Sequence, residues 1–206
     1  MSKFWLDTLA EFIADFRFEQ LPAATVEQSS YVILDTIGAI VGGAAEPEMQ
    51  ALSAKLTVSP VGEAAVMGTG KTAVSAAAAF LNGTAGTFLE MDEGNRFAKG
   101  HPSIHALPAV WAMAEIKGLS GKAAMEALVL GYEVGARIGI AASLRPDMHP
   151  HGTWGTVGAA AAVAKLLGYD AARIRETINV ASSLTLASSK RTMLEGGTVR
   201  NAYAGI

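Results

Sequence analysis

The chain of 206 residues contains no cysteine. This excludes disulfide bonds, and it also excludes iron–sulfur clusters and structural zinc sites of the kind that cysteine holds. Aromatic residues make up only 7% of the chain, whereas half of it is apolar and 22 residues are glycine. Small side chains let helix backbones approach one another, so this composition favours closely packed helices.

The chain also lacks an excess of one charge and any long apolar run. It has 16 Lys+Arg against 19 Asp+Glu, and no basic tract suggests nucleic-acid binding. Apolar runs such as residues 157–164 are much shorter than a membrane span. Residues 1–17 carry three acidic side chains, whereas a signal peptide needs a basic start and an uninterrupted apolar stretch. We therefore expect a soluble, cytoplasmic protein with no nucleic-acid or membrane partner.

Apolar residues recur at helical spacing along most of the chain, and this predicts an all-α fold. The expected helices cover residues 4–17, 25–43, 47–57, 75–88, 102–117, 120–142, 153–167 and 171–187. Within them, residues 25–28 have the form of a capping box, and Asn82-Gly83 is expected to interrupt its helix. The helix at 120–142 is apolar nearly all round, which indicates a central position. Residues 60–72 are expected to hold a short strand or hairpin, and 91–101 and 188–197 to be loops.

One glycine-rich segment, Gly68-Thr-Gly-Lys-Thr72, is similar to the end of a phosphate-binding loop. That loop needs a glycine where this chain has Ala65. An ordinary glycine-rich turn is therefore favoured, and we expect no nucleotide to bind there.

All four histidines fall in two pairs, each at the expected start of a helix. The pairs are His101 with His105 and His149 with His151. Histidine is the commonest general acid or base near neutral pH and a common metal ligand. The i, i+4 spacing of the first pair would suit a metal, but Pro102 indicates that His101 precedes the helix, and no HExxH motif is present. We therefore expect an acid–base site without a metal.

Charged and polar residues stand near both pairs. The acidic segment 90–95 directly precedes His101. It is either a solvated loop or the source of a carboxylate that orients or protonates a histidine. Free amides at the helix start near Thr153 would attract a substrate carboxylate, and Lys190 and Arg200 would bind further carboxylates. As isolated surface cations, the last two would carry no function.

Two longer segments resemble signatures of the MmgE/PrpD family. His101-Pro-Ser-Ile-His-Ala-Leu-Pro-Ala109, after its acidic segment, resembles the family's acidic pair followed by His-Pro-(Ser/Gly) and Pro-Ala. His149-Pro-His-Gly-Thr-Trp-Gly155 is similar to the family's His-Pro-Thr-Gly-Thr-x-Gly, with His151 in place of threonine. Leu34-Asp-Thr-Ile-Gly38 resembles a third, weaker motif, Leu-Asp-Thr-Leu-Gly. The resemblance extends over about residues 5–205.

The resemblance implies a domain organisation. Members of this family have a large helical domain and a smaller α/β domain, are longer than this chain, and use neither a metal nor an organic cofactor. Residues 1–206 would then form the helical domain, in incomplete form, of a homodimer. The α/β domain would be missing, or supplied by a C-terminal partner chain.

The resemblance also implies an enzyme, because the family includes 2-methylcitrate dehydratase, cis-aconitate decarboxylase and iminodisuccinate epimerase. We expect a cofactor-independent lyase that removes water from a small hydroxy-polycarboxylate such as 2-methylcitrate. Decarboxylation and epimerisation of a related polycarboxylate are the alternatives, as is a non-catalytic helical scaffold or an inactive fragment. A family lysine falls at Arg200. The resemblance implies that the acidic segment, His101 and His149 line the active site. Together with the residues considered above, we expect Asp92, His101 and His149 to be catalytic, and Glu90, His151, Thr153, Lys190 and Arg200 to bind the substrate.

Overall fold

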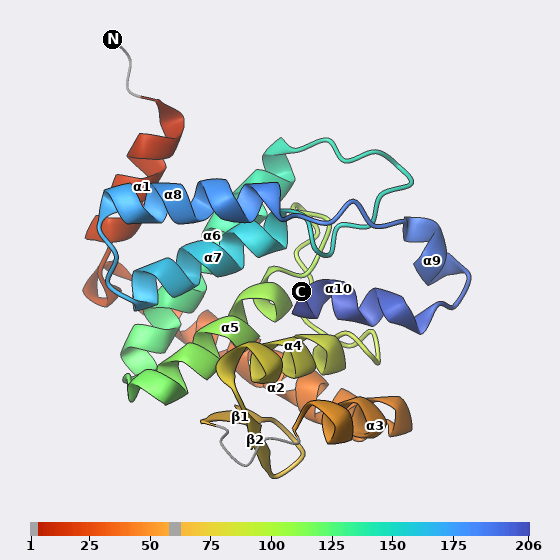
Figure 1. Ribbon diagram of the computed structural model, residues 1–206. Coiled ribbons are helices and arrows are strands. Elements are labelled where there is room, and N and C mark those ends of the chain that lie inside the picture. Colours follow the sequence, from red (N-terminus) through yellow and green to blue (C-terminus); the bar gives the residue numbers. More distant parts are fainter. Residues whose placement is uncertain (1–3, 58–62) are drawn as a thin grey trace.

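The computed structural model describes residues 4–57 and 63–206, which form a bundle of helices with one small hairpin (Figure 1). The helices in chain order are α1 (Trp5–Asp15), η1 (Phe18–Gln20), α2 (Ala23–Ala44), α3 (Pro47–Leu56), α4 (Ser75–Gly86), α5 (Pro102–Lys117), α6 (Gly121–Ala141), α7 (Trp154–Leu166), α8 (Ala171–Ser183), α9 (Lys190–Leu194), η2 (Thr198–Asn201) and α10 (Ala202–Gly205). Strands β1 (Ala64–Val66) and β2 (Lys71–Ala73) pair antiparallel. The expected all-α class is confirmed.

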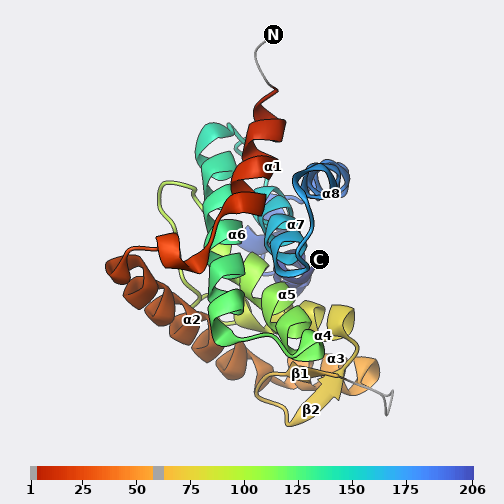
Figure 2. The ribbon, with the colours of Figure 1, turned by 90° about the vertical axis from the view of Figure 1, so that its left-hand side faces the viewer.

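The buried apolar side chains form two main clusters, one on each side of the contact between α5 and α7. The first joins α2, α4, α5 and the hairpin, and its fully buried members include Ile40, Leu81, Ile104 and Leu107. The second joins α1, α6, α7 and α8 through residues such as Ile13, Leu130, Ile174 and Ile178. Figure 2 shows α1 beside α7 and α8 in this second layer. Burial of each such side chain stabilises the fold by about 1.5–3 kcal/mol.

Glycines let α6 and α7 come unusually close. A Cβ atom added at Gly158 of α7 would lie 2.6 Å from the backbone oxygen of Gly131 on α6. A Cβ at Gly131 would lie 2.7 Å from the Cβ of Ala162. The small residues noted in the sequence thus serve a direct backbone contact, and this contact fixes the start of α7.

Several helix ends follow the sequence signals. The side chains of Ser120 and Asp170 each accept a hydrogen bond from the backbone amide three residues later, at 3.3 and 2.9 Å, and so cap α6 and α8. Gly118 and Gly168 adopt the left-handed conformation just after α5 and α7, with φ of 60° and 68°.

The expected capping box at residues 25–28 is wrong. Helix α2 begins at Ala23, directly after Pro22, so Thr25 lies inside its first turn. Proline is favoured at a helix start because it has no amide hydrogen to leave unpaired. The residue that marks the start of α2 is therefore Pro22.

The expected interruption at Asn82-Gly83 is also wrong, because α4 runs unbroken from Ser75 to Gly86. The Asn82 side chain is buried and bonds the hairpin, accepting from the Met67 amide and donating to the Ala65 carbonyl, both at 3.0 Å. A tertiary contact thus compensates for a residue that disfavours helices on its own.

The expectation of a central helix at 120–142 agrees with the structure, because α6 contributes buried residues to each of the core clusters, although Ile140 near its end is 56% exposed. The next part of the chain needs correction. The helix expected at 171–187 ends at Ser183, and the loop expected at 188–197 contains α9. Such short helices carry too few turns for a periodic signal.

The hairpin turn accounts for the segment Gly68–Thr72. Gly68 and Gly70 have φ of 77° and 68°, a conformation that glycine adopts without strain. The turn joins β1 to β2, which supports the interpretation as an ordinary glycine-rich turn. The expected strand segment began at Pro60, and residues 58–62 lie outside the described residues.

No helix within residues 4–57 and 63–206 combines the length and the apolar character needed to cross a membrane.

Candidate active site

His101 stands immediately before α5, as the sequence predicted. Pro102 occupies the first helical position, and a Cβ at the preceding Gly100 would lie 2.6 Å from the Trp154 ring. The chain therefore passes tightly over the start of α7 before it turns into α5. This contact holds the backbone before His101 close against Trp154.

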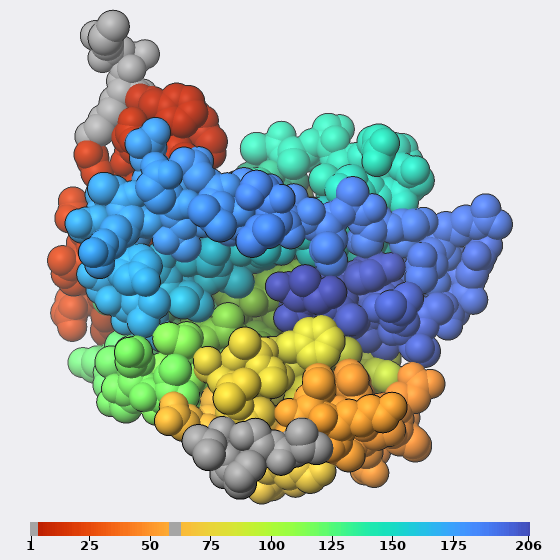
Figure 3. Space-filling model, in the orientation of Figure 1, coloured from red at the N-terminus to blue at the C-terminus, as the bar shows by residue number. Residues whose placement is uncertain are grey.

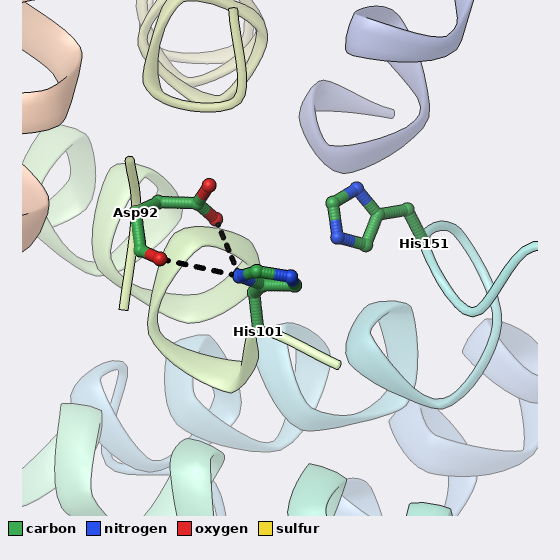
Figure 4. A group of neighbouring side chains, drawn as sticks. All are labelled: Asp92, His101 and His151. Carbon is green, nitrogen blue, oxygen red and sulfur yellow. Dashed lines mark hydrogen bonds and ion pairs between the residues drawn. The ribbon is translucent and has the colours of Figure 1, made fainter. Parts of the chain in front are cut away.

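One side of the His101 ring faces the acidic loop. Its Nδ1 lies 3.1 Å from Oδ2 of Asp92 (Figure 4). The same Nδ1 lies 2.7 Å from the carbonyl oxygen of Glu93. A carbonyl oxygen can only accept a hydrogen bond, so Nδ1 carries a hydrogen. The other ring nitrogen, Nε2, is then the atom at which His101 gains or loses its proton.

This surrounding favours the charged form of His101. Its pKa is raised to about 9, first by its hydrogen bond to Asp92 and further by the Asp92 charge and the two loop carbonyls, against the opposing effect of burial. The Asp92 side chain is only 2% exposed, whereas that of His101 is 30% exposed. His101 is thus predominantly an imidazolium at neutral pH, and it remains accessible to solvent.

Glu93 is a residue that the sequence did not single out. One carboxylate oxygen accepts from the Tyr132 hydroxyl at 2.7 Å and the other from the Ser103 amide at 3.1 Å. Burial raises the pKa of Glu93, and these two hydrogen bonds oppose that rise. Glu93 therefore ties the acidic loop to both α5 and α6. Its place in the acidic segment was a usable signal, but nothing pointed to Tyr132.

The second histidine pair lies on the loop before α7, where a crossing segment holds it. The His149 amide donates to the Ser188 carbonyl at 2.9 Å, and the Leu186 amide donates to the Gly152 carbonyl at 2.7 Å. The Lys190 amide closes the far end by donating to Asp147 at 2.7 Å. Backbone pairing therefore sets the position of His149 and its neighbours.

His151 lies at the centre of the four histidines. Its ring is 4.7 Å from that of His149 and 5.1 Å from those of both His101 and His105. It is 3% exposed, and burial, together with the other histidines, holds its pKa well below the usual value. His151 is consequently neutral.

His149 is also neutral at physiological pH. Burial, the His101 charge and the Lys190 charge lower its pKa in that order. Its Nδ1 accepts a hydrogen bond from the His151 amide at 3.1 Å, so the hydrogen of the neutral ring lies on Nε2. His149 therefore offers a hydrogen-bond donor to its surroundings.

His105 completes the cluster from inside α5. Its pKa is lowered to about 3, mainly by burial and then by His101 and His149, so it stays uncharged. A Cβ at Gly155 would lie 2.3 Å from the His105 ring. The glycine in the second motif is thus explained by the histidine in the first.

Arg200 and Glu90 are brought together, although 110 positions separate them. They form an ion pair in which the arginine side chain is 10% exposed and the glutamate side chain 54% exposed. Glu90 adopts φ of 54°, unusual for a residue other than glycine. Burial lowers the pKa of Arg200. In this structure the expected carboxylate-binding cation is therefore occupied by a carboxylate of the chain itself.

Thr153 and Lys190 lie at the margin. Thr153 is buried, and its hydroxyl donates to the Pro150 carbonyl within the turn. Lys190 is exposed at the start of α9 and reaches the histidines only through its charge on His149. The sequence thus found the four histidines and Asp92, whereas these two residues stand apart from the cluster.

The residues Asp92, His101 and His151 offer ligand atoms that all lie within 4.8 Å of one another, a spacing that a metal ion could bridge. Against this, the Glu93 carbonyl keeps a hydrogen on Nδ1 of His101. The Asp92 carboxylate already neutralises the imidazolium. These three side chains are therefore better suited to hold a proton on His101 than to bind a metal ion.

A cleft of about 370 Å³ opens beside the cluster between α4, α5, α7 and α10, with His105 and Thr156 among its lining residues. Figure 3 shows the surface hollowed between α8 above and α4 below, next to the C-terminal residues. The remaining lining is mostly alanine. One face of the histidine cluster therefore borders an apolar cleft.

Comparison with known proteins gives a consistent family relationship. The family model described as the MmgE/PrpD N-terminal domain matches residues 7–204. A cis-aconitate decarboxylase-like protein, oryM, of Aspergillus oryzae is 31% identical over 78% of this chain and 36% of its own length. Cis-aconitate decarboxylase of Aspergillus terreus is 28% identical over 96% of this chain and 42% of its own length. The human enzyme of that name is 36% identical over 52% of this chain and 24% of its own length. The chain thus spans about two fifths of the length of the Aspergillus relatives.

Proposed function

The chain belongs to the MmgE/PrpD family, and from this premise we propose that it carries the acid–base residues of a lyase for small polycarboxylates. The observation that supports this most is the Asp92–His101 pair, a buried carboxylate that keeps an accessible histidine charged. An imidazolium next to a bound carboxylate is suited to supply a proton to a neighbouring carbon or oxygen.

The proposed chemistry has one common step. Breaking a C–C or C–H bond next to a carboxylate leaves an electron pair on the carbon skeleton, and the carboxylate takes up part of the charge. Donors fixed in advance stabilise that charge. In this proposal the Nε2–H groups of His101 and His149 are such donors, and His101 delivers its proton.

Decarboxylation is the form we favour within this class. Carbon dioxide leaves, its bonding electrons remain on the skeleton, and a proton from Nε2 of His101 replaces it, after which solvent recharges the histidine. This route needs an acid but no base, and it agrees with the names of the relatives. Water elimination, which the sequence analysis put first, also needs a base with a free lone pair, whereas Nδ1 of His149 is engaged by the His151 amide.

The complete protein is proposed to be larger, because the relatives extend well beyond the matched part. Further chain, as an α/β domain or a partner subunit, would cover the histidines and exclude water, and homodimerisation remains part of this proposal. We expect the 206-residue chain alone to turn over slowly, since an open site admits competing water.

The test is turnover in D₂O with cis-aconitate, citrate and 2-methylcitrate, followed by proton NMR. Loss of carbon dioxide with one deuterium incorporated supports decarboxylation, and loss of water supports dehydration. His101→Ala and His149→Ala should each lower kcat by about 10²–10⁴-fold while the fold persists. Lys71→Ala, in the remote hairpin, is the control. Near-wild-type turnover in both histidine variants would contradict the proposal.

A further inference from the structure

The rings of His101 and His151 meet edge to face, with their centroids 5.1 Å apart. In Figure 4 a ring nitrogen of His151 faces the side of the His101 ring that Asp92 leaves free. One ligand atom from each of Asp92, His101 and His151 lies within 4.8 Å of the other two, so the three side chains border the same small space. An oxygen that accepts two hydrogen bonds of about 2.8 Å needs two donor nitrogens roughly 4.5–5 Å apart.

The hydrogen of neutral His151 can be located from burial. Nδ1 of His151 is buried and has no hydrogen-bond partner. A buried N–H without a partner is rarer in proteins than an acceptor without one. The hydrogen therefore belongs on Nε2. His101 presents Nε2–H as well, because its Nδ1 is bound to the Glu93 carbonyl.

We propose that His101 and His151 together hold one carboxylate oxygen of the substrate, with His151 acting as a neutral hydrogen-bond donor. This inference rests on the proposed function of a polycarboxylate lyase. Two N–H groups that converge on one point fit an anionic oxygen and reject a metal cation, which needs lone pairs.

The surroundings fix the His151 ring in this position. The His151 amide is bonded to His149, and the Ser188 hydroxyl donates to the His151 carbonyl at 3.4 Å. A Cβ at the next residue, Gly152, would already lie 3.0 Å from Leu186. The ring is enclosed by three other histidines, so its donor is held in place before the ligand arrives.

The pair His101–His151 is more available to a substrate carboxylate than Arg200 is. The imidazolium of His101 is neutralised by Asp92, which lies on the far side from His151. Arg200, the other buried cation near the loop, is paired with Glu90. A substrate carboxylate would have to displace Glu90 from Arg200, whereas it meets two open donors at the histidines.

The first test is nitrogen-15 NMR of the histidine-labelled chain, without any turnover. We expect His151 to be the uncharged Nε2–H form at pH 7. Addition of tricarballylate, an unreactive tricarboxylate, should shift the Nε2–H signals of both His101 and His151. An Nδ1–H form of His151, or signals that do not move at saturating tricarballylate, would overturn the inference.

The second test compares His151→Gln with His151→Leu. The glutamine amide offers an N–H near the position of Nε2, whereas leucine fills the space without a donor. We expect leucine to weaken tricarballylate binding by roughly 10- to 100-fold, the loss of one hydrogen bond to a charged group, and glutamine to retain most of it. Equal affinity in the leucine variant and the wild type would refute the donor role.

The two proposals fail separately. Binding of tricarballylate at His151 without turnover of any polycarboxylate, even when the missing domain or partner is supplied, would contradict the lyase and leave this site standing. Turnover together with an Nε2–H signal of His151 that does not shift would support the lyase and contradict this site. If neither variant folds, the NMR measurement on the unmodified chain still decides.

Discussion

Replacement of Asp92 by asparagine should return His101 to the behaviour of an ordinary histidine. Its pKa of about 9 against the usual 6.5 comes first from its hydrogen bond to Asp92. Each pKa unit corresponds to about 1.4 kcal/mol, so the pair favours the folded charged form by about 3 kcal/mol at most. The His101 side chain is 30% exposed, and solvent screening reduces this figure.

The sign of the pH effect follows from the raised pKa. The folded state binds the proton more tightly than the unfolded state, so this stabilisation is complete below pH 6.5 and is lost as pH rises through 9. In Asp92→Asn, this loss of stability between pH 6.5 and pH 9 should disappear. The free energy of unfolding of variant and wild type should therefore differ more at pH 6 than at pH 10, to the detriment of the variant.

Two measurements check this prediction. NMR titration of His101 should give a midpoint near 9 in the wild type and about 6.5 or lower in Asp92→Asn. If His101 acts as the acid, kcat/KM of the variant should fall by about 30-fold at pH 8 and little at pH 6, because the charged fraction drops from about 0.9 to about 0.03. Glu133→Gln, an acid-to-amide change at an ion pair on the exposed side of α6, is the control. An unchanged His101 midpoint, or a loss equal at every pH, would refute the reasoning.

Three further predictions follow from the same cluster. The pKa of His105 is lowered to about 3, so the folded state does not bind a proton that the unfolded state binds, and the free energy of unfolding should fall from pH 6.5 toward pH 3 by up to about 5 kcal/mol. His105→Leu should make the free energy of unfolding, measured in urea, less dependent on pH in this range. An unchanged pH dependence would count against the assignment. Gly155→Ala should lower stability by about 1–3 kcal/mol, because its Cβ would overlap the His105 ring. Gly121→Ala, with open space around it, should leave stability unchanged. Equal melting temperatures of these two variants would contradict this prediction. Turnover should survive EDTA, and elemental analysis of active protein should find no stoichiometric metal whose removal abolishes activity.

Much of the fold was predictable because its signals are local. Ser120 and Asp170 cap their helices, and Gly118 ends one, where the sequence indicated. The errors arose where a tertiary contact overrides local preference, as at Asn82, or where an element is too short to show a period, as at α9. The existence of the longer helices therefore followed from the chain alone, whereas short helices such as α9 and some boundaries did not.

For the candidate site, the sequence supplied the residue types, and the structure supplied their states. The two histidine pairs stood out by position, yet nothing local shows that His101 is charged while His151 is neutral. That difference comes from the depth of burial and from Asp92 lying 3.1 Å from one ring only. The Glu90–Arg200 pair joins segments 110 positions apart, which a single sequence does not reveal.

The close contact between α6 and α7 also limits how this protein can be changed in the laboratory. Gly158 faces a backbone oxygen of Gly131, so no substitution on the opposite helix can make room for a larger residue at either position. A directed-evolution library aimed at new substrates would lose its members mutated at these two glycines. The loop before α7 is held by backbone pairing with residues 186–190, so most of its positions can accept new side chains without changing its course, apart from Gly152, where a Cβ would meet Leu186. Mutating that loop at positions other than His149 and His151 would test new specificities, whereas mutating the two glycines would test only whether the chain folds.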